Sequence, residues 1–256
     1  LNIKFYLNSN LFKFKKDILF DNISFKYPTS NEFTLNKCCF KILHGQTIGI
    51  VGASGSGKST IVNILLGLLT PTSGRLVIDD IEINNKNINL WKENISYVPQ
   101  EVILTEPSII ENITLGENFS KIDEIKFRTS INIAQINEEL ISRQDLKNDG
   151  VGDRESNLSG GQLQRIGIAR SLYRDRPILI MDEATSALDS NIERKLLQRI
   201  KKKYSNKTLI LIAHRLHTLK DCDKIIVIEK GLVSGFDTWE NLYKNKNIFK
   251  NFVDKQ

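Results

Sequence analysis

The sequence predicts an α/β fold with a mostly parallel sheet, an N-terminal antiparallel β-subdomain and a helical insertion. Short, fully apolar segments such as 178–181 and 208–213 are typical of strands buried in a parallel sheet. Amphipathic segments with helical spacing, 160–173 and 191–203, alternate with them. The chain has 256 residues, of which 40% are hydrophobic and 26% charged, a balance that supplies an adequate globular core.

The first part of the chain is rich in strand signals. Turn residues at 28–31 separate two extended segments, and an amphipathic helix is expected over 58–69, ended by the Pro71 and Gly74 turn. After Gln100 the strand signals fade, and 121–141 has a broken helical pattern, so we expect a helical insertion over about 101–172. The strands expected outside this insertion and the segments above are 18–27, 33–43, 46–51, 75–78 and 224–228.

A glycine-rich loop joins the expected strand 46–51 to the helix that follows. It matches G-x-x-x-x-G-K-[ST], whose glycines turn backbone N–H groups toward a phosphate and whose helix points its positive end at the anion. Lys58 should reach the β- and γ-phosphates, and the Ser59 hydroxyl should bind Mg²⁺. The alternative is a glycine-rich turn with an accidental Lys-Ser. The expected phosphate-binding residues are Gly52, Ser54, Gly55, Ser56, Gly57, Lys58, Ser59 and Thr60.

Two carboxylates follow the apolar strand 178–181. Asp182 lies at the carboxyl edge of the expected sheet, where it can hold Mg²⁺ as the Walker B aspartate of P-loop NTPases does. Glu183 can activate or orient an attacking water. Many buried strands end in acids, so this pair gains its weight from the neighbouring motifs.

The chain resembles the ATP-binding cassette (ABC) ATPases over about residues 18–246, which leaves 1–17 as a linker or a remnant of a preceding domain and 247–256 as a tail. The resemblance implies a P-loop NTPase core with one cassette. It depends on five motifs in one order, which are the loop 52–59, Gln100, the LSGGQ sequence at 158–162, the segment 178–183 and His214.

The resemblance also implies roles for single residues. Two cassettes would dimerise head to tail around two ATP molecules, with Asp189 of the S-A-L-D segment at the interface. Gln100 would sense Mg²⁺ and the attacking water and link the site to a transport domain, and His214 would contact the γ-phosphate. Tyr27 would stack on adenine. The residues that would contact ATP on the other subunit are Ser159, Gly160, Gly161 and Gln162.

Some of these residues have simpler interpretations. Tyr27 could be an ordinary aromatic at a strand end, and His214 could be packed in a core beside its strand. Because the whole motif set is intact, with Glu183 and His214 both present, we expect real ATPase activity.

The segments 150–157 and 107–113 resemble exporter cassettes, although Asp153 and Glu155 depart from the exporter pattern, and Thr105 stands where exporters often carry Phe. The chain also ends soon after 239–243, without the extra β-domain of many importers. We therefore expect an exporter domain. Its transmembrane domain would precede Leu1, which is not Met, on the same polypeptide. An importer cassette on its own chain and a soluble ABC ATPase are the alternatives.

Composition limits the other possibilities. The net charge of +6 comes from lysines spread along the chain, which indicates solvated surface and no nucleic-acid partner. No apolar run reaches the ~18 residues of a membrane span, and no signal peptide is visible. Three cysteines without a C-x-x-C pair fit a reduced cytosolic protein. The expected location is the cytoplasmic face of the membrane, through the transmembrane domain.

Overall fold

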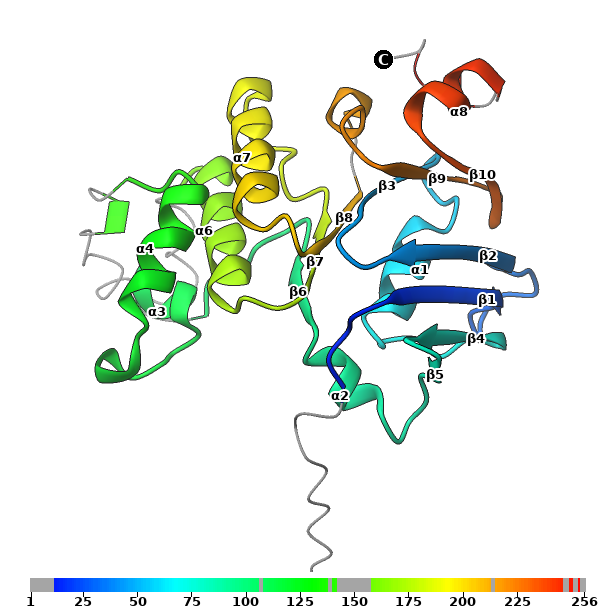
Figure 1. Cartoon of the computed structure of the whole chain (residues 1–256), viewed down its shortest axis with the longest axis horizontal. Helices are drawn as coiled ribbons and strands as arrows, with labels where there is room; N and C mark the ends of the chain where they lie inside the picture. The colour runs from blue at the N-terminus through cyan, green and yellow to red at the C-terminus, as the bar shows by residue number, and fades with distance from the viewer. Residues whose placement is uncertain are drawn as a thin grey trace, which may run out of the picture. The chain divides into compact units, whose positions relative to one another are not determined.

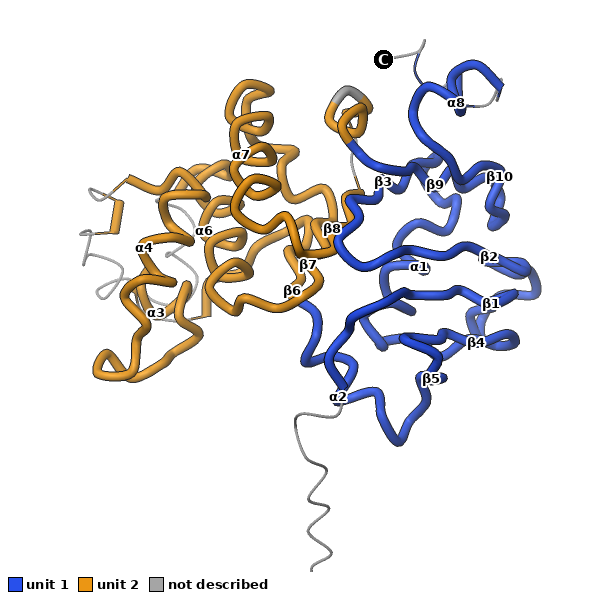
Figure 2. Tube along the Cα trace, in the orientation of Figure 1, with its two compact units in different colours: residues 1–95, 222–255 blue, residues 96–221, 256 orange. Residues whose placement is uncertain are grey.

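The computed structural model describes residues 12–105, 108–137, 140–141, 158–212, 215–245, 249–250 and 253. The chain divides into two compact units (Figure 2). Unit 1 contains residues 1–95 and 222–255, and unit 2 contains residues 96–221 and 256. The first unit is thus built from both ends of the chain, and the second is inserted between them.

Unit 1 contains an antiparallel sheet, in which the strand order is β2-β1-β4-β5 (Figure 1). Ile18 of β1 pairs with Ile42 of β2 on one side and with Ile78 of β4 on the other. Phe20 stacks on Phe40 with ring centroids 4.3 Å apart. The antiparallel β-subdomain predicted from the sequence is therefore confirmed. The strands are β1 (Asp17–Phe25), β2 (Leu35–Leu43), β4 (Ser73–Ile78) and β5 (Ile81–Glu82).

A second set of strands in unit 1 combines one parallel and one antiparallel pairing. Strand β3 (Thr47–Val51) is buried at all five residues and pairs in parallel with β9 (Lys224–Glu229). Strand β10 (Leu232–Asp237) runs antiparallel to β9 and is followed by helix α8 (Trp239–Asn245). Apolar residues on both faces explain the burial, since a parallel strand has no solvated face.

Helix α1 (Lys58–Leu65) follows the glycine-rich loop and is shorter than expected. The prediction that this helix extends to residue 69 is wrong. The N–H of Gly67 donates to the Ile64 carbonyl and that of Leu68 to the Asn63 carbonyl, which is a Schellman end. The helix therefore stops before it reaches Pro71.

Residues 12–16 belong to unit 1 and lie beside its helix α2 (Ile88–Lys92). Phe14 is buried and meets Trp91 edge-on, with ring centroids 6.4 Å apart. Trp91 is fully buried, and its indole N–H donates to the carbonyl of Leu65 at 2.6 Å. This bond satisfies one of the carbonyls at the end of α1 that the helix itself leaves unpaired.

Unit 2 combines three strands in the order β8-β7-β6 with a group of helices. Strand β7 (Ile178–Asp182) pairs in parallel with β8 (Thr208–Ile212), and β6 (Ile95–Val98) lies beside β7. The strands at 178–182 and 208–212 confirm the expected parallel sheet, apart from small differences at the ends.

The helices of unit 2 gather around α6 (Figure 1). Helix α6 (Gly160–Tyr173) has the predicted bounds, and α7 (Ser190–Lys203) starts one residue earlier than predicted. The helical pattern over 121–141, which was predicted to be broken, is interrupted just after the end of α4, where Gln135 adopts a left-handed φ of 58°. The remaining elements are α3 (Ile109–Thr114), η1 (Phe119–Lys121), α4 (Glu124–Ile133) and η3 (Leu216–Leu219).

Among the described residues, no helix combines the length and the apolarity that crossing a bilayer requires.

Replacing Trp91 with Phe tests the packing of this part of unit 1. The Trp91→Phe variant keeps an aromatic ring but leaves the Leu65 carbonyl without its indole donor. We expect the free energy of unfolding to fall by about 1–3 kcal/mol, measured by urea denaturation. Phe33→Leu, at a half-exposed position of the same unit, is the control. Equal unfolding midpoints for Trp91→Phe and the parent would contradict the assigned role.

Candidate functional site

The glycine-rich loop of unit 1 leads from β3 directly into α1. Within it, the N–H of Ser56 donates to the Ala53 carbonyl at 3.1 Å, and the Ser56 carbonyl accepts from the N–H of Gly231 at 3.0 Å. Gly57 caps α1 with a φ of 111°, and a Cβ there would lie 2.7 Å from Leu35 Cδ2. Both the left-handed backbone and the close approach require glycine at this position.

The first turn of α1 is suited to an anion. Its N-cap is a glycine, which has no side chain to accept from the N–H groups at the helix start. The Lys58 ammonium lies over the loop and donates to the carbonyls of Gly52 at 2.8 Å and Ala53 at 3.0 Å. Positive charge and oriented N–H groups therefore occupy one small region, which fits a phosphate group.

Ser56 adds a polar atom to this region. Its side chain is 5% exposed, and its Oγ has no hydrogen-bond partner among the residues that the structure describes. Such a buried hydroxyl normally has a partner, so this atom also fits a loop built for a polar ligand. Ser54, Gly55 and Ser59 are exposed at the same loop.

Tyr27 lies two residues beyond β1. Its ring meets Phe25 edge-on at 4.8 Å, and its hydroxyl is 3.4 Å from Thr60 Oγ1 in the first turn of α1. The structure thus places Tyr27 beside the helix that begins at the loop, while its stacking on adenine stays a prediction. The simpler interpretation, an aromatic at a strand end, describes its local packing equally well.

Asp182 ends strand β7 in unit 2. Tyr97 of β6 donates its phenolic O–H to Asp182 Oδ2 at 3.3 Å. Burial, together with the nearby Asp182 carboxylate, raises the pKa of Tyr97 to about 12. The phenol is therefore protonated at neutral pH and orients the carboxylate. Tyr97 is not among the site residues predicted from the sequence. Gln100, which is among them, lies exposed in the bend after β6.

Glu183 directly follows Asp182 in a left-handed conformation, with a φ of 50°. Its N–H still donates to the Ile212 carbonyl at 2.9 Å, so the backbone stays attached to β8 while it turns. A non-glycine residue in this region of φ/ψ space costs about 1–3 kcal/mol, and such residues are concentrated at functional sites. No sequence pattern signals this conformation.

The LSGGQ sequence forms the start of α6. Ser159 is the N-cap, and its Oγ accepts from the N–H of Gln162 at 3.2 Å. Gln162 Oε1 in turn accepts from the N–H of Ser159 at 2.8 Å, which completes a capping box. The helix start predicted at Ser159 is confirmed. The two bonds of the capping box do not use the N–H groups of Gly160 and Gly161.

The two units divide the predicted site residues between them. Unit 1 contains the loop residues and Tyr27, and unit 2 contains Gln100, the LSGGQ residues, Asp182, Glu183 and Asp189. His214 and the exporter-like segment 150–157 lie outside the described residues. Asp189 is the N-cap of α7.

Comparison with known proteins shows the family to which the chain belongs. The chain matches the family described as ABC transporter over residues 35–186. The chain belongs to the ABC transporter family. The proteins that it resembles include ATP-dependent transporters and an ABC exporter.

Individual relatives show how far the ABC similarity extends. An ATP-dependent lipid A-core flippase of Albidiferax ferrireducens is 38% identical over 94% of this chain and 41% of its own length. Multidrug resistance protein 1 of Entamoeba histolytica is 40% identical over 94% of this chain and 19% of its own length. The solved structure of a bacterial Atm1-family ABC exporter with ATP bound covers 96% of this chain and 43% of that chain, with 31% identity and a TM-score of 0.87. The chain therefore spans less than half the length of these ABC relatives.

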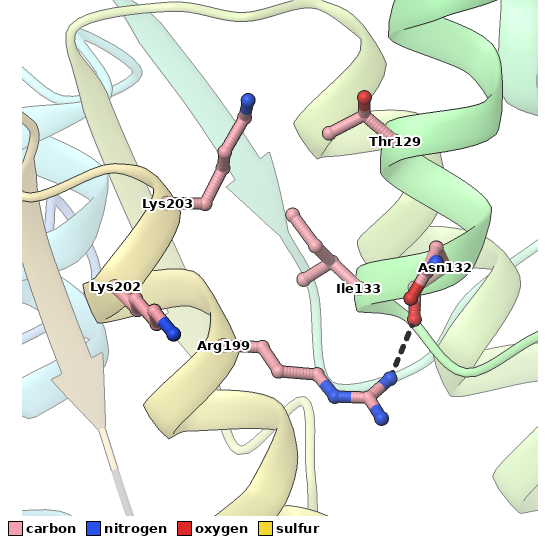
Figure 3. Close-up of a pocket in the computed structure, with 6 residues that line it drawn as sticks. All are labelled: Thr129, Asn132, Ile133, Arg199, Lys202 and Lys203. Carbon is pink, nitrogen blue, oxygen red and sulfur yellow. Dashed lines mark hydrogen bonds between the residues drawn. The ribbon is translucent and has the colours of Figure 1, made fainter.

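Unit 2 of this ABC domain also has a cavity of about 520 Å³ between α4 and α7 (Figure 3). Arg199 reaches across and donates to the Asn132 carbonyl at 2.8 Å. Lys202 and Lys203 belong to the last turn of α7, where positive charge offsets the negative end of the helix dipole. The lining residues are Thr129, Asn132, Ile133, Arg199, Lys202 and Lys203.

The pKa of Tyr97 leads to a pH-dependent prediction. The folded protein holds the Tyr97 proton up to about pH 12, whereas the unfolded chain releases it near pH 10. Stability is therefore fully present below pH 10 and falls as the pH rises toward 12. In the Tyr97→Phe variant this fall should be less steep, measured by urea unfolding across the range. Some fall should remain, because burial also raises the pKa of Tyr204 to about 12. Identical slopes would contradict the prediction.

Proposed function

We propose that this ATPase domain powers an exporter-type transporter by ATP-driven, head-to-tail dimerisation of two copies. The loop at the start of α1 is the observation that carries the proposal. It combines a helix start without a side-chain cap, the Lys58 ammonium and the buried Ser56 hydroxyl in one region. These features, together with the LSGGQ sequence at the capped start of α6, are those expected of a cassette that binds nucleotide between two subunits.

In unit 1 the proposed role is nucleotide binding. The loop residues from Gly52 to Thr60 hold the phosphates, with Lys58 as the point charge and the Ser59 hydroxyl as a Mg²⁺ ligand. Tyr27 stacks on adenine. When bound, Mg²⁺ neutralises charge on the phosphate oxygens, which favours transfer to water.

In unit 2 the proposed roles concern hydrolysis and the partner subunit. Asp182, oriented by Tyr97, and Gln100 hold the Mg²⁺ side of the site, while Glu183 takes the proton from the attacking water. His214 contacts the γ-phosphate. Ser159, Gly160, Gly161 and Gln162 offer hydrogen-bond donors to the nucleotide held by the other subunit, with Asp189 at the same interface.

The proposed partner is a transmembrane domain on the same polypeptide, preceding Leu1, which would place this domain at the cytoplasmic face of the membrane. Support comes from the relatives, of which the chain covers 41% and 19%. Closure of the dimer would re-aim the membrane helices, and hydrolysis would reopen it, a population shift driven by ligand. The coding sequence before Leu1 tests this, since a fused membrane domain needs several apolar stretches of ~20 residues each.

Glu183→Gln tests the general base. An amide keeps the size and hydrogen-bonding reach of the side chain but cannot take a proton at neutral pH. We expect ATP turnover at saturating Mg²⁺-ATP to fall at least ~10²-fold. Binding of a fluorescent ATP analogue should be retained and the dimer should persist in ATP, as size-exclusion chromatography would show. Unchanged turnover would remove Glu183 from the role of base.

Lys58→Ala tests the phosphate loop. Without the ammonium the loop loses its positive point charge, so we expect weaker binding of the ATP analogue, measured by fluorescence titration. Lys37→Ala, at an exposed lysine of the same unit, is the control and should bind as the parent does. Equal affinities for Lys58→Ala and Lys37→Ala would contradict the assigned phosphate site.

A further inference from the structure

The S-A-L-D segment at 186–189, here called the interface loop, is held by side chains of unit 2, of which two are buried. It lies between β7 and α7, and the N–H of Leu188 donates to the Thr185 carbonyl at 3.0 Å. None of the side chains that hold it belongs to a motif that the sequence analysis recognised. They come from α6, from α7 and from the segment after β8.

Gln164 holds the interface loop from the side of α6. Its amide nitrogen donates to Ser186 Oγ at 2.9 Å, and its amide oxygen accepts from the N–H of Ala187 at 2.9 Å. Gln164 is 5% exposed, so both bonds are largely shielded from water. Because α6 begins at Ser159, this one side chain ties the helix of the LSGGQ sequence to the interface loop.

Direct packing strengthens the same connection. A Cβ on Gly161 would lie 3.1 Å from the Ala187 carbonyl oxygen and 3.4 Å from Leu188 Cδ2. The second glycine of LSGGQ thus lies close against the backbone of the interface loop, and a larger residue there would push the two apart. The helix start and the loop are therefore in contact through backbone as well as through Gln164.

Arg215 holds the interface loop from the opposite direction. Its Nη1 donates to the Leu188 carbonyl at 2.7 Å and to Glu193 Oε2 at 3.3 Å, and its Nη2 lies 3.5 Å from the Ser186 carbonyl. A guanidinium can serve such separate acceptors because its donors form a fixed planar fork, which a lysine lacks. Arg215 directly follows His214 in the sequence.

Glu193 keeps Arg215 in place. This carboxylate is 2% exposed on the inner face of α7, and its other oxygen accepts from the Thr185 hydroxyl at 2.6 Å. A buried charge is tolerated when it is paired and hydrogen-bonded, and Glu193 meets both conditions. Thr185 immediately precedes the interface loop, so the ion pair fixes the loop at its beginning and through the Leu188 carbonyl near its end.

We propose that Gln164, Glu193 and Arg215 are positioning residues, which hold the LSGGQ helix start and the interface loop in one fixed arrangement. The inference rests on the proposed function, in which Ser159 and Asp189 act at the interface between two subunits. Its specific content is that these residues set the turnover rate of the assembled dimer and leave nucleotide binding by unit 1 unchanged. Misplacement of a catalytic arrangement by 1 Å can cost about 10²-fold in rate.

Arg215→Lys and Gln164→Met are the informative variants. Lysine keeps a positive charge beside Glu193 but loses the fork, and methionine keeps the length of Gln164 but loses both bonds. For each we expect kcat for ATP hydrolysis to fall by about 10- to 10²-fold, with an unchanged Kd for a fluorescent ATP analogue. Arg199→Lys is the matched control, because Arg199 also donates to a backbone carbonyl of unit 2 but does not touch the interface loop.

The double variant Arg215→Lys, Gln164→Met tests whether the residues act together. If they hold one arrangement, the loss of kcat in the double variant should be smaller than the product of the two single losses. A purely structural role would instead lower the thermal midpoint, and kcat would recover at lower temperature. That result would overturn the inference.

The outcomes separate the inference from the proposed function. If the parent and Arg199→Lys hydrolyse ATP and both single variants keep the parental kcat, the inference is wrong while the proposed function stands. If the parent itself binds no nucleotide and hydrolyses none, the proposed function fails first. Should Arg215→Lys fail to fold, Gln164→Met still decides, since it leaves the Glu193–Arg215 pair intact.

Discussion

Parallel pairing of fully apolar strands is the constraint on which both units depend. A strand buried on both faces must pair all its backbone groups within the sheet, and parallel neighbours end at the same edge. In unit 1 this applies to β3, which pairs with β9 and leads into the glycine-rich loop. In unit 2 it applies to β7, which pairs with β8 and ends in Asp182 and Glu183. The chemistry-bearing residues follow strands whose position the ladder has already fixed.

Charged and strained groups at these strand ends are stabilised locally. Lys58 is held by two carbonyls of its own loop, and Asp182 by the Tyr97 phenol. Glu183 keeps its left-handed backbone because its N–H remains bonded to Ile212. The left-handed backbone of Glu183 costs some stability, and the other contacts hold a functional group in place, which is typical of preorganised sites. The ion pair of the buried Glu193 with the partly exposed Arg215 extends the same principle to the interface loop.

The similarity to ABC exporters and the physical argument support different statements. The matched relatives establish the family, and the structural neighbour resembles this chain over 96% of its length. The loop, the carboxylates and the capped LSGGQ helix are the features from which we propose nucleotide binding and hydrolysis. The chain covers 41% of one of these relatives, so its similarity concerns only part of such a protein.

Local patterns in the sequence determined the elements and the motifs. The bounds of α6 and the positions of β7 and β8 followed from apolar runs and helical spacing, because burial of a whole face leaves a periodic trace. The phosphate loop followed for the same reason, since its glycines and Lys58 act within a few residues of one another. The sequence also contained a signal for the end of α1, because Gly67 is the kind of residue that ends a helix. The prediction placed the end at Pro71 instead.

Only the tertiary structure decided the contacts between segments far apart in the chain. Gln164 meets Ser186 across 22 positions and Arg215 meets Leu188 across 27, and no local pattern selects such partners. A signal for Glu193 did exist, because it shares the apolar face of α7 with Leu196, Leu197 and Ile200. The left-handed turns at Gln135 and Glu183 had no signal in the sequence, since neither residue is a glycine. Interactions between residues close in the chain can be predicted from the sequence. The long-range contacts and left-handed turns described above depend on which segments the complete fold brings together.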